Sequence, residues 1–550
     1  MERTTVADVV GSTLARLGVD TVFGLAGSGN FVVTNALVAG GARFVSARHE
    51  SGAVAMADGW ARTTGRVGVA SVHQGPGLTN TVTALAEAAK ARTPVLVLAG
   101  DTPPAALRSN FRIDQHDLVR AVGAVPELVY SAQTAAADAA RALRRAELER
   151  RPVVLMMPID LQAAAAPSPD EIAAVPPPAP PAPAADAVAA AADILQAAQR
   201  PVIIAGRGAI VAEARDPIEV LGDRTGALLA TSAMANGLFA GLPYALGISG
   251  GFASPLAAEL IAESDVVLSI GATLNHWTTR HGALLGPGSQ LIGVDLEPSA
   301  FGAQRQPELA VVGDAAATAF ALQAELALRD HRAPGRRTPG IARAIAERRW
   351  RDEPYPDEPP AGTIDPRTLA IALDDLLPAD RAVAVDSGAF TGWPAMYLGV
   401  SDPRAWLFCN AFQCVGLALG AAIGAAVARP DRITVAAVGD GGMFLALPEL
   451  DTLARLRLPV LVVVFNDGAY GAEVHHFAPM GHDVAIAQFP ENDLAAIARG
   501  AGVPAHTVRS AGDLAPVREW ATAPGGPLLL DAKVDPNICA DWLAEAFRGG

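Results

Sequence analysis

The chain repeats one hydrophobic pattern, in which short apolar runs alternate with longer amphipathic stretches, and the pattern is clearest between residues 433 and 471. The β-branched, apolar runs at 433–438 and 460–465 are typical of buried parallel strands. Between them, leucines recur every third residue and predict a crossover helix whose first turn suits Pro448. These leucines are Leu447, Leu450, Leu453 and Leu456. Such a unit places the carboxyl ends of both strands at one edge of a sheet.

The same alternation predicts two further units of this type. The first has strands expected at 21–25, 44–47, 67–72, 94–99 and 153–157, with helices that end near residue 17 and cover 51–63 and 78–90. The second has strands expected at 201–204, 227–231, 266–270 and 290–294. The predicted fold class is therefore α/β, with three doubly wound parallel-sheet domains.

Shifts in composition mark the expected domain boundaries. Residues 166–185 are rich in Ala and Pro, which predicts a semi-rigid linker. Charged and proline-rich segments bracket residues 331–362 and predict a second linker. A chain of 550 residues is too long for one core, so we expect domains at 1–165, 186–330 and 363–550.

Charge and hydropathy exclude two classes of partner. The net charge of −15 argues against binding to nucleic acid or to an anionic membrane. Hydrophobic residues make up 51% of the chain and charged residues 18%, which indicates a large globular interior. The longest apolar run, at 415–428, is shorter than the roughly 20 residues that span a bilayer, so it predicts a buried helix.

The cysteines and the N-terminal residues indicate the compartment. Cys409, Cys414 and Cys539 form neither a disulfide framework nor a zinc-binding spacing, as expected in a reducing environment. The first ten residues lack the basic and then apolar pattern of a signal peptide. We therefore expect a cytoplasmic enzyme.

Polar residues follow the two strands of the clearest unit. Asp440 ends the first strand and Asn466 ends the second, 26 residues later, which is the length of one crossover. Their oxygen atoms are ligands that suit Mg²⁺, and the backbone N–H groups of Gly439, Gly441 and Gly442 suit a phosphate. The sequence therefore predicts a magnesium and phosphate site at this sheet edge, although Asp and Asn are also ordinary turn residues.

The GDG at 439–441 and the NDG at 466–468 together resemble the cofactor signature of thiamine diphosphate (ThDP) enzymes. The resemblance implies that the side chains of Asp440 and Asn466 and the carbonyl oxygen of Gly468 bind Mg²⁺, which holds the diphosphate. It also implies cofactor contacts from the neighbouring glycines and from Tyr470. The third domain would then be the diphosphate-binding domain.

The segment RHESGAVAMADGWAR, from residue 48, resembles the pyrimidine-binding domain of the same superfamily. Glu50 matches the catalytic glutamate of that family, which shares a proton with the pyrimidine ring and needs a mostly apolar site. A surface glutamate favoured by a helix dipole is the alternative. In the family the equivalents of Glu50 and Asp440 meet across a subunit interface, which implies a homodimer or homotetramer.

Two further segments resemble parts of the cofactor site. FQCVGLALGAAIG, at 412–424, matches the segment that leads into the diphosphate domain, and Val415 occupies the position that bends the cofactor. A larger apolar residue is more usual there, and Val415 could equally be a core residue at a helix start. In DSGAFTG, at 386–392, the resemblance implies that Ser387 and Gly388 meet the diphosphate.

The reaction is indicated by residues that follow two strands of the first domain, those expected at 21–25 and 67–72. Ser28 lies in a glycine loop and His73 follows a strand, and with NDGAYGAEVHHF this pattern most resembles benzoylformate decarboxylase. The resemblance implies that Ser28 and His73 contact the substrate carboxylate and relay protons. The alternatives are a helix-capping hydroxyl at Ser28 and a turn-holding imidazole at His73. A second catalytic histidine is expected at either His276 or His281.

These resemblances imply a ThDP- and Mg²⁺-dependent, non-oxidative 2-oxo acid decarboxylase or carboligase that acts on 2-oxo acids and aldehydes. Two alternatives stay open. HQGPGLTN and LGISGG also resemble acetolactate synthases, but the flavin-associated motif is not evident, so no required FAD is expected. A non-catalytic ThDP-binding subunit is the other alternative. The role of Glu473 is open, and His475 and His476 are candidates to line the pocket.

Overall fold

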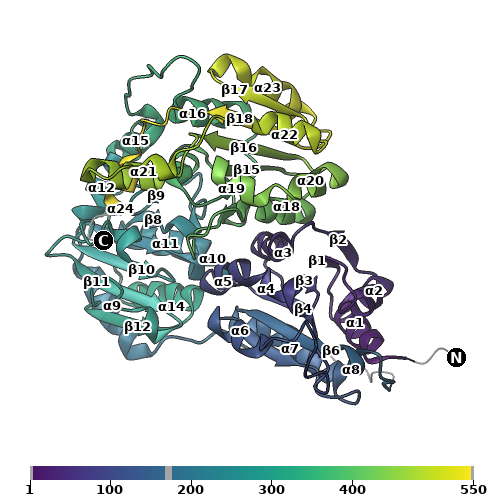
Figure 1. Cartoon of the computed structure of the whole chain (residues 1–550). Coiled ribbons are helices and arrows are strands. Elements are labelled where there is room, and N and C mark those ends of the chain that lie inside the picture. The colour runs from purple at the N-terminus through teal and green to yellow at the C-terminus, as the bar shows by residue number, and fades with distance from the viewer. Residues whose placement is uncertain (1–3, 168–175, 177, 547–550) are drawn as a thin grey trace.

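The computed structural model describes residues 4–167, 176 and 178–546. Within these ranges the strands form three six-stranded sheets, and every strand pair in them is parallel. Figure 1 shows the three sheets as three lobes with helices around each. The predicted fold class is confirmed.

The N-terminal sheet has the strand order β2-β1-β3-β4-β6-β5. Its strands are β1 (Thr21–Gly24), β2 (Arg43–Ser46), β3 (Gly68–Val72), β4 (Val95–Asp101), β5 (Val125–Leu128) and β6 (Pro152–Pro158). Its helices are α1 (Val6–Arg16), α2 (Phe31–Ala39), α3 (Glu50–Thr64), α4 (Pro76–Thr79), α5 (Val82–Lys90), α6 (Gln115–Ala121), α7 (Ala135–Glu149) and α8 (Ile159–Gln162). The single helix predicted at 78–90 is wrong, because the hydroxyl of Thr81 donates to the carbonyl of Leu78 where α4 and α5 are divided.

The central sheet has the order β12-β11-β10-β7-β8-β9. Its strands are β7 (Pro201–Ala205), β8 (Leu228–Thr231), β9 (Ala245–Ile248), β10 (Val266–Ile270), β11 (Gln290–Asp295) and β12 (Leu309–Val312). Its helices are α9 (Ala185–Ala197), α10 (Arg207–Val211), α11 (Arg215–Thr225), α12 (Pro255–Ala262), α13 (His276–Thr279) and α14 (Ala315–Leu328). The sequence did not predict β9 and β12, which are four-residue edge strands with exposed positions.

The C-terminal sheet has the order β14-β13-β15-β16-β18-β17. Its strands are β13 (Arg381–Val385), β14 (Trp406–Phe408), β15 (Ile433–Gly439), β16 (Val460–Asn466), β17 (Ala505–Val508) and β18 (Leu528–Lys533). Its helices are α16 (Pro366–Leu376), α17 (Gly392–Tyr397), α18 (Ala418–Ala428), α19 (Asp440–Ala446), α20 (Glu449–Leu456), α21 (Gly471–Phe477), α22 (Leu494–Gly500), α23 (Ala515–Thr522) and α24 (Asp541–Ala546). The crossover predicted as one helix is two, α19 and α20, because Pro448 has no N–H to continue the first.

The two predicted linkers differ in what the structure describes. Of the linker predicted at 166–185, residues 168–175 and 177 lie outside the described residues. The linker predicted at 331–362 contains a helix, α15 (Pro339–Glu347), which lies near α12 of the central unit. The domain boundaries themselves stay predictions.

Helices α3 and α18 join the N-terminal and C-terminal units (Figure 1). A Cβ atom on Gly424 of α18 would lie 1.9 Å from the carbonyl oxygen of Met56, and one on Gly59 of α3 would lie 2.1 Å from that of Ala421. The glycines therefore let the two backbones approach closely, and one hydrophobic core runs through both units. The predicted buried helix at 415–428 is confirmed as α18, which starts three residues later.

The sequence led us to expect neither a membrane-spanning helix nor a disulfide framework. Within the described ranges, every helix falls short of the length and apolar character needed to cross a bilayer. The three cysteines are all free thiols, and Cys409 is buried.

Candidate active site

Asp440 and Asn466 lie at neighbouring strand ends, as predicted. β15 and β16 pair in parallel with Gly439 opposite Phe465, so the residues that follow share one sheet edge. Asp440 is the first residue of α19 and Asn466 is the last residue of β16. Both are buried, with 4% and 5% of their surface exposed, so their polar atoms need partners.

The amide of Asn466 is oriented by a buried polar network. Its Nδ2 donates to Oδ1 of Asp531 over 2.7 Å and to Oδ1 of Asn492 over 3.1 Å. Its Oδ1 therefore faces the loop that follows, where it accepts from the N–H of Gly468 over 3.3 Å. Asp531 is in turn paired with Lys533 over 2.9 Å. Asn492, Asp531 and Lys533 were not predicted, because they come from segments that only the fold brings to Asn466.

The carboxylates around this edge favour a cation. Burial raises the pKa of Asp440 to about 6, and burial together with the charge of Asp440 raises the pKa of Asp467 to about 7. Among the described residues no three His, Cys, Asp or Glu side chains gather as a metal site. The predicted set differs in kind, since it joins one carboxylate to an amide oxygen and the carbonyl of Gly468. These hard oxygen donors fit Mg²⁺.

Glycines form a cradle around the same edge. A Cβ on Gly442 would lie 2.4 Å from Oδ2 of Asp386, and one on Gly441 would lie 2.9 Å from the ring of Tyr470. Gly388 has a φ of 149°, which L side chains rarely adopt, and follows Ser387 after β13. Such crowded backbone lets N–H groups approach a ligand closely, so these residues fit a diphosphate held by a divalent cation.

Val415 and Tyr470 lie on the open side of the cradle. Val415 is 40% exposed, and its Cγ1 lies 3.3 Å from where a Cβ on Gly442 would be. Tyr470 is also exposed, and its ring meets that of Phe489 edge-on at 4.9 Å. A pocket of about 370 Å³ lies beside the loop at 467–471, which follows β16. It is lined by Asp467, Gly468, Ala469, Gly471, Val474, Gln488, Phe489, Pro536 and Asn537. This volume suits a small molecule.

A second cluster lies in the N-terminal unit. Nε2 of His73 lies 3.1 Å from Oγ of Ser28, and Nδ1 of His73 lies 3.1 Å from the carbonyl oxygen of Gln74. Because a carbonyl oxygen only accepts, Nδ1 carries the proton in the neutral ring and Nε2 accepts from the Ser28 hydroxyl. The imidazole is thus ready to take a proton at Nε2.

Glu50 lies beside this pair. It is the half-buried first residue of α3, and its Oε2 accepts from Nδ2 of Asn80 over 2.9 Å. A Cβ on Gly77 would lie 2.9 Å from Cβ of His73 and 3.6 Å from Oε1 of Glu50. The fold therefore brings Ser28, His73 and Glu50 together. No hydrogen bond or ion pair among the described residues joins Glu50 to Asp440 within one chain.

The two candidate central histidines form a pair of their own. The rings of His276 and His281 are 5.3 Å apart, and partial burial and His281 lower the pKa of His276. Within the described part of the chain, no hydrogen bond or ring contact links either of them to Ser28 or His73. Their catalytic role stays a prediction.

The residues after Tyr470 lie on α21. Glu473 is exposed in the first turn of this helix. Burial lowers the pKa of His475, and the ring of His476 packs against Phe477.

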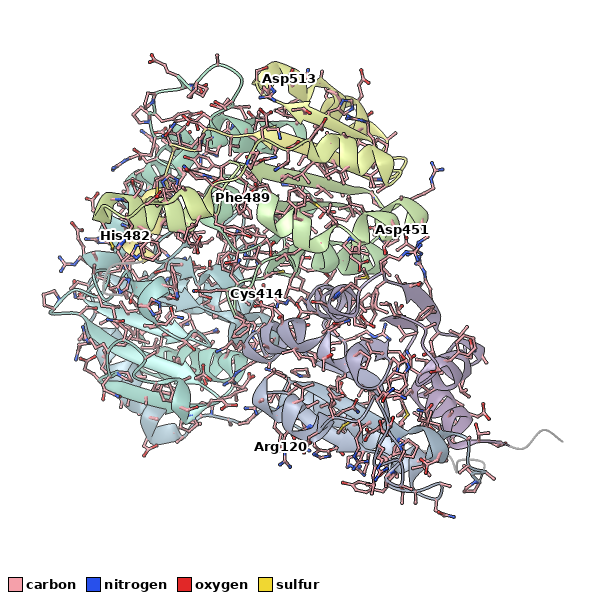
Figure 2. The ribbon with its side chains drawn as sticks, viewed as in Figure 1. Arg120, Cys414, Asp451, His482, Phe489 and Asp513 are labelled. Atoms are coloured by element: carbon pink, nitrogen blue, oxygen red, sulfur yellow. The ribbon has the colours of Figure 1, made fainter. Side chains whose placement is uncertain are left out.

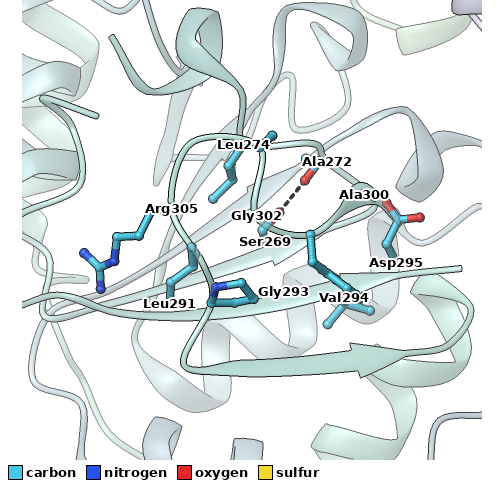
Figure 3. Close-up of a pocket in the computed structure, with 13 residues that line it drawn as sticks. Ser269, Ala272, Leu274, Leu291, Gly293, Val294, Asp295, Ala300, Gly302 and Arg305 are labelled. Atoms are coloured by element: carbon cyan, nitrogen blue, oxygen red, sulfur yellow. Dashed lines mark hydrogen bonds between the residues drawn. The ribbon is translucent and has the colours of Figure 1, made fainter. Parts of the chain in front are cut away.

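A smaller pocket lies in the central unit between β10 and β11 (Figure 3). Its lining includes Leu274, Leu291 and Val294, and Oγ of Ser269 donates to the carbonyl of Ala272 over 2.7 Å, the dashed line in the figure. Its volume of about 20 Å³ holds little more than a water molecule. The larger pocket, beside the loop at 467–471, is therefore the better candidate for a substrate.

Three parallel sheets, with carboxylate and amide oxygens beside glycines at one sheet edge, are typical of α/β enzymes that bind phosphorylated cofactors. Residues 4–121 match the thiamine pyrophosphate enzyme N-terminal TPP binding domain, residues 188–322 the central domain and residues 386–532 the C-terminal TPP binding domain. The chain belongs to the thiamine pyrophosphate enzymes, and thiamine pyrophosphate is another name for ThDP. The resemblance inferred from the motifs is confirmed.

Similar proteins carry several activities in their names. A "Probable 2-ketoarginine decarboxylase" of Pseudomonas aeruginosa is 33% identical over 83% of this chain and 81% of its own length. An "Acetolactate synthase large subunit" of Parasynechococcus marenigrum is 32% identical over 82% of this chain and 75% of its own. A "Sulfoacetaldehyde acetyltransferase" of Castellaniella defragrans is 29% identical over 98% and 93%. The chain is thus an enzyme of the ThDP-dependent decarboxylase and carboligase superfamily.

Proposed function

We propose that this chain is a Mg²⁺- and ThDP-dependent, non-oxidative 2-oxo acid decarboxylase, similar to benzoylformate decarboxylase, that can also ligate the acyl group to an aldehyde. The observation that carries the proposal is the Ser28–His73 hydrogen bond beside Glu50. A hydroxyl, a neutral imidazole and a carboxyl within one loop cluster suit a reaction that binds a carboxylate and moves protons.

The residues of the glycine cradle would hold the cofactor. Asp440, Asn466 and Gly468 would bind Mg²⁺, and a second group would contact the cofactor itself, with Glu50 at the pyrimidine. That group consists of Ser387, Gly388, Val415, Gly439, Gly441, Gly442 and Tyr470. When bound, ThDP supplies the nucleophile and electron sink that allow a 2-oxo acid to lose CO₂.

The side chains of the N-terminal cluster would handle the substrate. When a 2-oxo acid binds, the Ser28 hydroxyl would turn from Nε2 of His73 to donate to the substrate carboxylate, and the freed Nε2 would exchange a proton with the carbonyl oxygen. Because Nδ1 of His73 donates to the Gln74 carbonyl, the ring would keep Nε2 directed at this task. Glu50 would hold the proton that the pyrimidine ring needs. One of His276 and His281 would supply the second catalytic imidazole.

A panel of 2-oxo acids tests this function. Wild type with ThDP and Mg²⁺ is offered benzoylformate, pyruvate and 2-ketoarginine, with and without aldehydes, and the products are analysed by mass spectrometry. We include 2-ketoarginine because of the similar protein named for it and because exposed Glu473 could pair with a guanidinium. We expect release of CO₂ and an aldehyde from at least one acid.

Two variants connect this activity to the site. Glu50→Gln should lower kcat by about 100-fold or more, because it removes the shared proton. His73→Ala should lower kcat/KM, because the variant lacks the Nε2 atom that would exchange a proton with the substrate. Glu149→Gln, which alters only an exposed pair with Arg145, is the matched control. Equal rates in wild type and Glu50→Gln would leave a non-catalytic ThDP-binding subunit as the better explanation.

An acetolactate synthase-like carboligase is the second candidate, and the 32% identity to such an enzyme favours it. It would join two pyruvate-derived units into a 2-hydroxy-2-methyl-3-oxo acid instead of releasing acetaldehyde. We propose that FAD is not required. A colourless, active protein supports this, whereas a stoichiometric flavin spectrum in the purified enzyme argues for the synthase type.

We further propose that the enzyme is a cytoplasmic homodimer or homotetramer in which each site takes Glu50 from one subunit and Asp440 from another. Among the described residues no hydrogen bond or ion pair joins Glu50 to Asp440 within one chain, which supports this arrangement.

A further inference from the structure

The loop at residues 409–417, between β14 and α18, is held by a carboxylate from the N-terminal unit. Glu87 lies on α5 and is only 2% exposed. Its Oε2 accepts from the N–H of Phe412 over 2.7 Å, and its Oε1 accepts from the N–H of Ala411 over 3.1 Å. The thiol of Cys414 also points at Oε2, over 3.8 Å. Figure 2 labels Cys414 where the N-terminal and C-terminal parts of the ribbon meet.

A second buried carboxylate holds the other end of the same loop. Oδ2 of Asp386 accepts from the N–H of Gly416 over 2.7 Å, and its Oδ1 accepts from the N–H of Leu417 over 3.2 Å. The loop is therefore suspended between Glu87 of the N-terminal unit and Asp386 of the C-terminal unit. Hydrogen bonds that are shielded from water in this way are stronger than those exposed to it.

The residues between the two carboxylates are Gln413, Cys414 and Val415. Gln413 has a φ of 56°, a left-handed conformation that is uncommon for a side chain other than glycine. Such a conformation persists only where its surroundings hold it in place. Val415 follows two residues later and faces the glycine cradle, 40% exposed. The exposed valine thus owes its position to the hydrogen bonds at the two ends of a strained segment.

Arg62 links this loop to the helix that begins with Glu50. Nη2 of Arg62 lies 3.2 Å from Oε1 of Glu87, and Nη1 donates to the carbonyl of Phe408 over 2.9 Å. Arg62 also pairs with Asp58 on α3 over 2.8 Å. The loop, α5 and α3 therefore form one connected network around the Glu87 carboxylate and the Arg62 guanidinium.

We propose that Glu87 is a positioning residue that sets the place of Val415 against the bound cofactor, and through it the cofactor affinity and the size of acyl group that fits. The inference rests on the proposed function, since it assigns the Val415 side of the cradle to the cofactor. Glu87 would act through the backbone of Ala411 and Phe412 and not by direct contact with substrate or cofactor.

Glu87→Gln tests the proposal, because glutamine keeps the shape but has only one accepting oxygen for the loop. ThDP binding in the presence of Mg²⁺ is measured by isothermal calorimetry, and the product pattern over a series of 2-oxo acids of increasing size is measured alongside. We expect ThDP to bind about tenfold more weakly, as for other residues that position a binding group, and the preference among acyl groups to change.

Glu127→Gln is the matched control. Glu127 is also a buried glutamate of the N-terminal unit and also pairs with arginines, Arg141 and Arg145, but its hydrogen bonds stay within that unit. We expect this control to bind ThDP as wild type does. A loss of affinity that is equal in both variants would overturn the proposal, because it would reflect general destabilisation.

A rescue separates positioning from folding. Glycine adopts a φ of 56° without strain, so Gln413→Gly added to Glu87→Gln should recover at least half of the lost binding free energy. A structural role confined to the Arg62 pair would not respond to Gln413→Gly, and an absence of recovery would overturn the proposal. If Glu87→Gln does not fold, Glu87→Asp, which draws the carboxylate back from the loop, takes its place in each comparison.

The outcome for wild type keeps the two proposals apart. A wild-type protein that neither binds ThDP nor turns over any 2-oxo acid would refute the proposed function. A wild-type protein that does both, with Glu87→Gln identical to it in ThDP affinity and product pattern, would refute only the role of Glu87.

Discussion

Asp386 holds the loop before α18 through a buried carboxyl group, at a cost to stability near neutral pH. Its carboxyl is fully buried, and this burial raises its pKa to about 7, although backbone N–H groups from residues 387 and 416–418 favour the charged form. The carboxylate that holds the loop at Gly416 is thus charged only against the desolvation cost of its site. Because the folded-state pKa lies above the unfolded value of 3.8, the protonated group stabilises the fold at low pH.

This shift predicts a pH dependence of stability for Asp386→Asn. In wild type, the contribution of Asp386 is fully present below about pH 4 and is lost as the pH rises through about 7. The variant lacks this loss, so its melting temperature relative to wild type should rise between pH 4 and pH 8, with a change of about 4 kcal/mol at most in unfolding free energy. Thermal scans of both proteins without cofactor measure it. Melting curves that stay parallel over this range would contradict the assignment.

The orientation of the Asn466 amide is fixed by its neighbours and not by its own position in the sequence. An isolated amide can present either its oxygen or its nitrogen to a metal, and the sequence only places Asn466 at a strand end. Asp531 and Asn492 decide between the two, because both accept from Nδ2 and leave Oδ1 towards the loop. The predicted residue type was therefore informative, but its usable atom depended on residues 26 and 65 positions away.

The crossing of helices α3 and α18 determines how the two cofactor-binding units are joined. The residues at the crossing are small, and Gly59 and Gly424 face backbone carbonyls of the opposite helix. Any side chain there forces the helices apart, because a backbone atom cannot move aside as the end of a flexible side chain can. Since Glu50 is the first residue of α3, a shift of this helix also moves the candidate acid.

We predict that Gly424→Ala destabilises the protein by about 3 kcal/mol, as expected for overpacking of a tight core. Its Cβ would lie 1.9 Å from the carbonyl oxygen of Met56. The midpoint of chemical unfolding, followed by tryptophan fluorescence, measures the effect. Gly500→Ala is the control, because no atom lies within 4 Å of its Cβ and alanine favours a helix. Equal midpoints for both variants would show that α3 and α18 pack less tightly at this crossing than these distances indicate.

The two candidate clusters lie in different units of the chain, so a complete site forms only where they meet. Ser28, His73 and Glu50 gather in the N-terminal unit, and Asp440, Asn466 and the glycines gather in the C-terminal unit. A cofactor that uses both clusters needs them to face each other. The proposed homo-oligomer would meet this need if the N-terminal cluster of one subunit faced the C-terminal cluster of another.

Mixing two inactive variants tests this arrangement. Glu50→Gln and Asp440→Ala should each be nearly inactive as pure proteins. Co-expressed in equal amounts, they should recover about a quarter of wild-type activity, since half of the dimers are mixed and each has one intact site of two. Steady-state rates and sedimentation of the co-purified protein measure it. A mixture that stays inactive would contradict sites shared between subunits, as would a fully active monomer.

Much of the site followed from local sequence, because its residues sit at the ends of strongly patterned elements. The apolar runs that became β15 and β16 predicted that Asp440 and Asn466 would share an edge. Short edge strands such as β9 and β12 were missed, since four residues with exposed positions have no continuous apolar run. The divided helices α4/α5 and α19/α20 were missed because periodicity persists across a break made by one hydroxyl or one proline.

Local sequence was enough to predict the fold class, the cofactor family and the candidate residue types at the cradle, because strand periodicity and glycine placement are local properties of the chain. Which polar atoms meet depends on how distant segments fold together. The Ser28–His73 bond spans 45 residues, and the bonds from Glu87 to the Val415 loop span more than 320. Contacts over such separations depend on how whole units pack against each other. A local pattern along the chain carries no information about that packing.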